Sequence, residues 1–103
     1  MTAMLRDEAL ARIRLHRSEL TRLGIARLFL FGSVARDEAN IASDIDVVVD
    51  TADGRAPGLF LLARISDELE RILGRRVDVI SKSGLDHTTR LKRRVGPELV
   101  HVF

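Results

Sequence analysis

Residues 27–49 read RLFLFGSVARDEANIASDIDVVV, in which two apolar runs are separated by a polar linker. The first run, residues 27–31, ends at Gly32 and Ser33, an arrangement typical of a buried strand followed by a turn and a short helix. In the second run, residues 44–49, Ile45, Val47 and Val49 are expected on one face, while the other face carries Asp44, Asp46 and Val48. We expect these two strands to form the centre of a small α/β sheet.

Two long helices and a third strand are predicted on either side of this stretch. The first helix covers residues 4–23, and the second covers residues 59–73 and ends at Gly74. Residues 77–81 read VDVIS and predict the third strand. The apolar sides of the two helices carry Leu5, Ala9, Ile13, Leu20 and Leu23 in the first, and Leu62, Ile65, Leu69 and Ile72 in the second.

The C-terminal part is less regular. From Leu85 onward the sequence predicts a basic helix that breaks at Gly96 and Pro97, and residues 99–103 predict an edge strand or a packing tail. The order helix, strand, short helix, strand, helix, strand predicts an α/β fold, with helices packed on a small mixed β-sheet. We expect residues 1–103 to form a single domain.

Composition excludes several classes of protein. The chain has 103 residues, of which 46% are hydrophobic and 31% charged, and its apolar residues are periodic, which argues against disorder and against a membrane protein. It has no cysteine, so disulfides and thiolate nucleophiles are excluded, and its three histidines are scattered. Charged residues at positions 6–8 interrupt any early apolar run, so no secretory signal is predicted and we expect a cytoplasmic protein.

Charge is segregated along the chain although the net charge is only +2. Residues 37–53 contain six acids and no lysine or arginine, whereas residues 75–94 contain seven bases against Asp78 and Asp86. Two solvated faces of an ordinary domain would give this pattern. A cation site in the acidic stretch would give it as well.

Three aspartates are candidates for that cation site. Asp44 and Asp46 share one face of their predicted strand, about 6–7 Å apart, and a divalent cation such as Mg²⁺ or Mn²⁺ would offset their repulsion. If the third strand lies beside the second, Asp78 can complete a cluster able to hold two metal ions. Alternatively, all three aspartates face water and Asp78 pairs with Arg75 or Arg76.

The Gly32-Ser33 pair is a candidate phosphate site. Backbone N–H groups and a hydroxyl between a buried strand and a helix suit a phosphate group, although Ser33 could instead cap the helix. Ten residues separate this pair from the Asp-Ile-Asp run that begins at Asp44. Together with a distant third aspartate, this combination describes a metal-dependent nucleotide site.

Residues 31–36, FGSVAR, and residues 43–49, SDIDVVV, resemble the signature of the minimal nucleotidyltransferases of the polymerase-β-like superfamily. That signature runs Gly-Ser-x-Ala-Arg-Gly, a spacer, and Ser-Asp-Ile/Leu-Asp before an apolar strand, and the similarity extends over nearly the whole chain. The resemblance implies the polymerase-β-like nucleotidyltransferase fold. It further implies catalytic metal ligands at Asp44, Asp46 and Asp78, and nucleotide phosphate contacts at Gly32 and Ser33.

Two neighbouring residues need separate interpretation. Arg36 is a candidate phosphate contact, but it could equally pair with Glu38 or Asp44. Asp37 stands where the family most often has glycine. This extra acid either weakens triphosphate binding or faces solvent without effect, and we favour the second interpretation.

The resemblance implies a specific reaction. Free-standing members of the family are commonly paired with a HEPN ribonuclease toxin, which implies an antitoxin that transfers AMP from ATP to a tyrosine of that toxin, with Mg²⁺ or Mn²⁺ as cofactor. A chain of 103 residues has no room to grip a primer and a template, so a processive polymerase is excluded.

Two other functions stay open. The domain could be a non-catalytic module that masks a partner through its basic stretch, residues 90–94, or its apolar tail; three retained, mutually repelling carboxylates argue against this. It could also transfer a nucleotide to a small molecule such as an aminoglycoside, with a second subunit supplying the missing helical domain. Direct RNA binding is disfavoured, because the chain has no tyrosine or tryptophan on which bases could stack.

Overall fold

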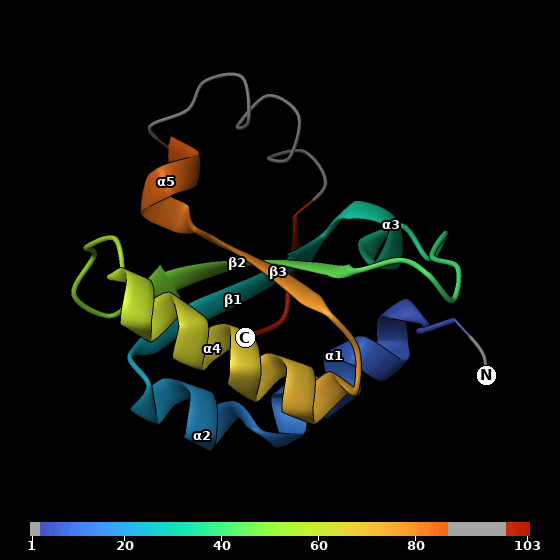
Figure 1. The fold of residues 1–103 in the computed structure, drawn as a ribbon, viewed down its shortest axis with the longest axis horizontal. Helices are drawn as coiled ribbons and strands as arrows, with labels where there is room; N and C mark the ends of the chain where they lie inside the picture. Colours follow the sequence, from blue (N-terminus) through green and yellow to red (C-terminus); the bar gives the residue numbers. More distant parts are fainter. Residues whose placement is uncertain (1–2, 87–98) are drawn as a thin grey trace.

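A four-stranded mixed sheet forms the centre of the molecule in the computed structural model, which describes residues 3–86 and 99–103 (Figure 1). The strands β1 (Ile25–Phe31), β2 (Ile45–Thr51), β3 (Val77–Ser81) and β4 (Val100–His101) lie in the order β3-β2-β1-β4. β1 is antiparallel to both of its neighbours, whereas β2 and β3 are parallel. The predicted α/β fold with a small mixed sheet is thus confirmed, and the second and third strands are adjacent.

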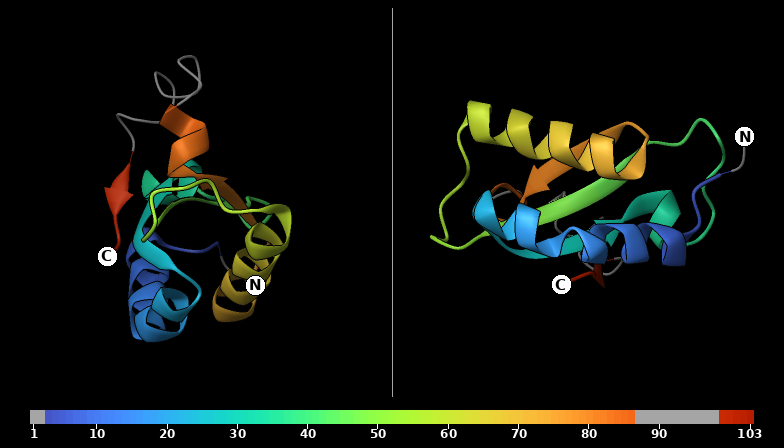
Figure 2. Two further views of the ribbon diagram at one scale, coloured as in Figure 1. Left: turned by 90° about the vertical axis from the view of Figure 1, so that its left-hand side faces the viewer. Right: turned by 90° about the horizontal axis from the view of Figure 1, so that it is seen from below.

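Helices cover the sheet unequally. Figure 2 shows α1 (Arg6–Leu15), α2 (Arg17–Arg22) and α4 (Leu59–Leu73) on one face, which we call the lower face after its place in Figure 1. The short helix α3 (Gly32–Ala35) follows directly from β1, and α5 (Lys82–Asp86) lies above the other face. Among residues 3–86 and 99–103, the long helices therefore all lie on the lower face.

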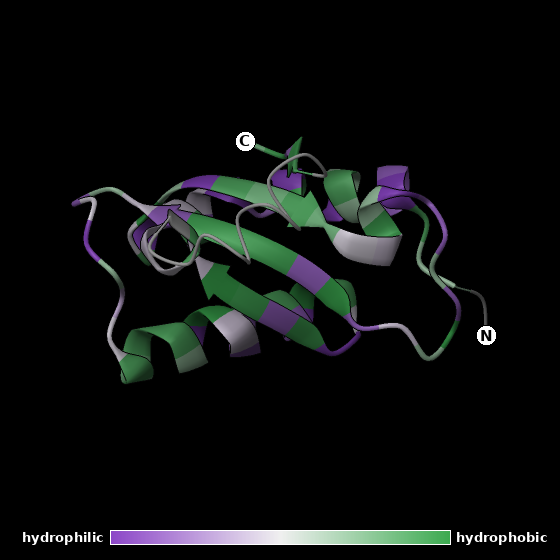
Figure 3. Cartoon of the chain, turned by 90° about the horizontal axis from the view of Figure 1, so that it is seen from above, coloured by the Kyte–Doolittle hydropathy of each residue, from purple (hydrophilic) through white to green (hydrophobic). Residues whose placement is uncertain are grey.

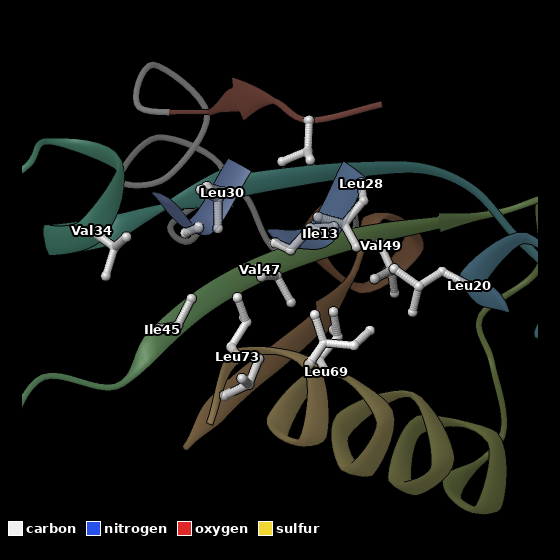
Figure 4. Close-up of a cluster of buried hydrophobic side chains, with 14 of the residues drawn as sticks. Ile13, Leu20, Leu28, Leu30, Val34, Ile45, Val47, Val49, Leu69 and Leu73 are labelled. Carbon is white, nitrogen blue, oxygen red and sulfur yellow. The ribbon is translucent and has the colours of Figure 1, made fainter. Parts of the chain in front are cut away.

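The main core lies between the lower face and the long helices. Ile45, Val47 and Val49 are fully buried there against residues of α1 and α4 such as Ile13 and Leu69 (Figure 4). Burying each such side chain contributes about 1.5–3 kcal/mol relative to leaving it exposed. The predicted alternation along this strand is confirmed.

A second, smaller cluster lies on the upper face. Val48 points there and packs with Phe31 and Leu85, which belong to β1 and α5. This cluster covers only part of the upper face of β2. Asp46 lies on the same face of β2, two residues before Val48. A half-buried carboxylate and a fully buried apolar side chain are therefore neighbours on this face.

The helix and the strand after the second run begin and end where the sequence predicts. α4 ends at Gly74, whose φ of 68° is left-handed and whose N–H donates to the Glu70 carbonyl oxygen at 2.7 Å. Glycine adopts this conformation without the steric penalty that a Cβ brings. The chain then turns into β3 at the predicted residue, Val77.

The single helix predicted for residues 4–23 is wrong, because two helices occupy this segment with His16 between them. The His16 N–H bonds to the Ile13 carbonyl oxygen, while the His16 ring lies 3.0 Å from the carbonyl oxygen of Arg12. That oxygen would accept the His16 N–H in a continuous α-helix. Leu5 is also misplaced by the prediction, since it is exposed and Met4 is buried instead.

The C-terminal residues fit both interpretations given for them, each over part of the segment. Val100 and His101 form the edge strand β4, which pairs with β1, and Val102 and Phe103 are buried. The basic helix predicted beyond Asp86, with its break at Gly96 and Pro97, lies outside the described residues. No helix within residues 3–86 and 99–103 is long and apolar enough to cross a membrane.

Candidate functional site

Two of the three predicted carboxylates lie opposite each other on neighbouring strands. The parallel register of β2 and β3 pairs Asp46 with Asp78. Figure 3, which views the upper face, shows a hydrophilic segment on each of these two otherwise apolar strands, side by side. Asp46 is half-buried and Asp78 is exposed. The sheet therefore brings together two aspartates that are separated by a loop and a long helix in the sequence.

The third aspartate is coupled to this pair through its charge. Burial raises the pKa of Asp46 above its ordinary value, and repulsion from Asp78 and Asp44 raises it further, while Arg36 lowers it. Two neighbouring carboxylates thus act on Asp46. The strand predicted from Asp44 begins one residue later, at Ile45, so Asp44 lies just before β2. A bound cation would relieve the same repulsion.

The carboxylates of Asp46 and Asp78 lie on adjacent strands but do not form a complete metal-binding site. The described part of the chain contains no group of three or more histidine, cysteine, aspartate or glutamate side chains already placed to hold a metal ion. The donor set nevertheless suits a hard cation, because Mg²⁺ and Mn²⁺ prefer carboxylate oxygens. The three-carboxylate metal site therefore stays a prediction.

The raised pKa of Asp46 predicts how stability depends on pH in the absence of metal. A carboxyl whose pKa is raised by folding binds more protons in the folded state, so its contribution to stability is lost as pH rises through the window above 3.8. Asp46→Asn removes this contribution. We expect the variant to gain stability relative to the wild type as pH rises through that window, in urea titrations with a chelator present. A difference that stays flat or shrinks would contradict the assignment.

Gly32 touches the half-buried aspartate directly. Its φ of 74° is left-handed, and a Cβ at this position would overlap Oδ2 of Asp46 and lie 3.2 Å from its Cγ. The turn after β1 therefore packs its backbone against the carboxylate on β2. A side chain in place of the glycine hydrogen would therefore push the Gly32 turn and the Asp46 carboxylate apart.

Ser33 and Arg36 follow Gly32 in the chain, and their side chains have different surroundings. Ser33 lies inside α3 and makes no capping hydrogen bond, so the interpretation of Ser33 as a helix cap is wrong. Arg36 is exposed and forms an ion pair with Glu38 at 3.1 Å, which is the alternative given for it above. Its charge also reaches Asp46.

Asp37 has a structural role that the sequence analysis missed. Its φ of 60° is left-handed, which explains why glycine suits this position and why aspartate, which tolerates that region, can replace it. Its Oδ1 accepts a hydrogen bond from the N–H of Arg6 at 2.9 Å, at the first residue of α1. Asp37 is exposed to solvent, in line with the interpretation that we favour, but it also contributes a contact to the fold, and its effect on triphosphate binding stays a prediction. The aspartate at a position where the family most often has glycine was the feature of the sequence that could have indicated this role.

We expect Asp37→Ala to lower the free energy of unfolding by about 1–2 kcal/mol, because it removes the acceptor for an otherwise unpaired helix N–H. Asp37→Asn keeps both the acceptor oxygen and the tolerance for a left-handed backbone, so it should differ little from the wild type. Urea midpoints of the two variants provide the measurement. Equal midpoints for alanine and asparagine would mean that the bond to Arg6 contributes nothing.

Comparisons with known proteins converge on one family. The nucleotidyltransferase domain family matches residues 12–98 of this chain. The protein adenylyltransferase MntA of Thermococcus cleftensis is 36% identical over 88 residues, which are 84% of this chain and 85% of that protein. A solved structure identified as a minimal nucleotidyltransferase superposes with a TM-score of 0.75 and 39% identity, over 94% of this chain and 95% of that one.

A more distant structure shares the fold. It belongs to the complex of a tri-AMPylated Shewanella oneidensis HEPN toxin with an MNT antitoxin. The TM-score is 0.59 at 19% identity, over 87% of this chain and 71% of that one. At this identity the similarity concerns the arrangement of the strands and helices only.

Proposed function

This chain belongs to the nucleotidyltransferase domain family, and we propose that it transfers AMP from ATP to a tyrosine hydroxyl of a partner HEPN ribonuclease toxin, thereby acting as an antitoxin. The observation that carries the proposal is the packing of the Gly32 turn against Asp46, with Asp78 in register beside it. A turn suited to phosphate and carboxylates suited to a divalent cation meet at one point of the upper face. The name of the Thermococcus cleftensis relative and the HEPN complex support the choice of a protein acceptor.

The reaction forms one bond and breaks one. The tyrosine oxygen bonds to the α-phosphorus of ATP, and the bond from that phosphorus to the oxygen leading to the β-phosphate breaks. Pyrophosphate leaves with the electron pair, and the hydroxyl proton passes to solvent. A bound divalent cation, Mg²⁺ or Mn²⁺, supplies neutralisation of the charge that develops on the phosphates and a lower pKa for the attacking hydroxyl.

Each candidate site residue has its own role in the proposed reaction. Asp44, Asp46 and Asp78 would hold the cation through their carboxylate oxygens. Gly32 and Ser33 would bind the triphosphate, since the first N–H groups of a helix have no acceptor within it and the Ser33 hydroxyl makes no capping bond. Arg36 would neutralise phosphate charge by exchanging its Glu38 partner for the nucleotide.

The test is the intact mass of a candidate HEPN partner after incubation with this protein, ATP and Mg²⁺. We expect one or more increments of an AMP group on the partner. The control is the double variant Asp44→Asn, Asp46→Asn, which should bind the partner and add no mass. Peptide mapping of the product then identifies the modified residue.

Other outcomes separate the remaining functions. Binding without any mass increment for the wild type would overturn catalysis and favour a module that masks its partner. Absence of both binding and transfer would overturn the protein acceptor, and a small hydroxyl compound such as an aminoglycoside would be tested next.

A further inference from the structure

A cavity of about 460 Å³ adjoins the candidate site. It is bounded by the first part of α1, the segment leading into β2, and the turn between α4 and β3, which lie at one end of the molecule (Figure 1). Asp44 lines this cavity, whereas Gly32, Ser33, Asp46 and Asp78 do not. The cavity therefore shares one carboxylate with the candidate site and is separate from the turn proposed to bind the triphosphate.

Arginines give this cavity, the arginine pocket, its charge. Its wall contains Arg12, Arg75 and Arg76 together with the acids Glu8 and Asp44, so basic groups are in excess. Arg12 is already paired with Glu8 at 2.9 Å. Arg76 is exposed, and no hydrogen bond or ion pair engages its guanidinium within residues 3–86 and 99–103. The wall can therefore accept an anionic group without losing a contact of Arg76.

The same wall is partly apolar. Met4, Ile41 and Leu73 line it, and Ile41 remains 59% exposed. Arg75 donates to the Ile41 carbonyl oxygen at 3.5 Å, which holds a guanidinium beside this exposed side chain. A wall that combines guanidinium groups with an exposed aliphatic side chain, Ile41, matches a peptide with acidic and apolar side chains, since a bare phosphate chain would leave the apolar part unused.

We propose that the arginine pocket binds an acidic segment of the polypeptide that carries the acceptor hydroxyl. The inference rests on the proposed function, in which transfer needs a second substrate besides ATP. Asp44 lies just before β2 and Asp46 is two residues further along the chain, so their Cα atoms are at most about 7 Å apart, and a segment in the pocket lies beside the carboxylates. A tyrosine a few residues from the acidic segment can then reach the nucleotide.

The experiment compares two fluorescent peptides, each with one tyrosine flanked by glutamates and leucine or by lysines and leucine. Binding is measured by anisotropy without ATP, and transfer by mass with ATP and Mg²⁺. The wild type should bind the acidic peptide more tightly than the basic one. The double variant Arg75→Glu, Arg76→Glu should bind the acidic peptide about tenfold more weakly than the wild type does, and the basic peptide more tightly. The matched control is Arg22→Glu, Arg64→Glu, which reverses two exposed charges outside the pocket and should leave both affinities unchanged.

The outcomes distinguish the pocket from the proposed function. A reversed preference in the variant shows that it is folded and supports the pocket, even if the wild type transfers nothing, in which case only the proposed function fails. Equal transfer to both peptides, unaffected by charge reversal, would overturn the pocket and leave the proposed function standing. Displacement of the acidic peptide by metal-free ATP would also overturn it, because the cavity would then bind nucleotide.

Discussion

Asp46→Asn should reduce nucleotidyl transfer by about a thousandfold or more while leaving the protein folded. The carboxylate is half-buried against Gly32 and faces Asp78 across the strand pair, so asparagine removes one charged oxygen from the place where cation and phosphates would meet. Loss of roughly 4 kcal/mol of transition-state stabilisation by a metal ligand corresponds to this factor. The measurement is the rate of AMP incorporation into the acceptor at saturating ATP and Mg²⁺.

Stability separates this effect from misfolding. Without metal, the variant should be as stable as the wild type or more so, because a carboxylate that is repelled by two others has been neutralised. Asp67→Asn, an exposed aspartate on the solvent side of α4, serves as the matched control and should retain full activity. Retention of activity by Asp46→Asn would remove this residue from the catalytic site.

Local signals predicted much of this fold. α4 and β3 begin and end at the predicted residues because their boundaries depend on neighbours in sequence, such as the left-handed Gly74 that ends the helix. The break at His16 could not be predicted in this way. It depends on whether the backbone N–H or the ring of His16 lies against the Arg12 carbonyl oxygen. The periodicity of apolar residues gives no information on this choice.

The candidate site shows the same division. The sequence predicted the residue types and the closeness of Asp44 and Asp46, because Cα atoms two residues apart stay within about 7 Å of each other, although only Asp46 lies within β2. It could not predict that Asp78 lies opposite Asp46, since the register of β2 and β3 depends on how α4 returns the chain. The hydrogen bond from Arg6 to Asp37 likewise joins residues 31 positions apart.

The contact between Gly32 and Asp46 is the other feature that only the folded chain reveals, and it predicts a large effect of Gly32→Ala. A Cβ would overlap Oδ2 of Asp46, and because that atom is the free end of a side chain, the carboxylate can rotate away at little cost in stability. A displacement of about 1 Å at a reacting centre can cost a hundredfold in rate. We therefore expect at least that loss of transfer.

Gly54→Ala separates backbone strain from displacement of the carboxylate. Gly54 has nearly the same left-handed φ, 71° against 74°, but a Cβ there meets nothing within 4 Å. Both variants should lose about 1–2 kcal/mol of stability, the cost of a left-handed alanine, and only Gly32→Ala should lose activity. If both stay active, the turn does not position Asp46. If Gly32→Ala is far less stable than Gly54→Ala, the carboxylate is held rigidly and the loss of rate reflects unfolding.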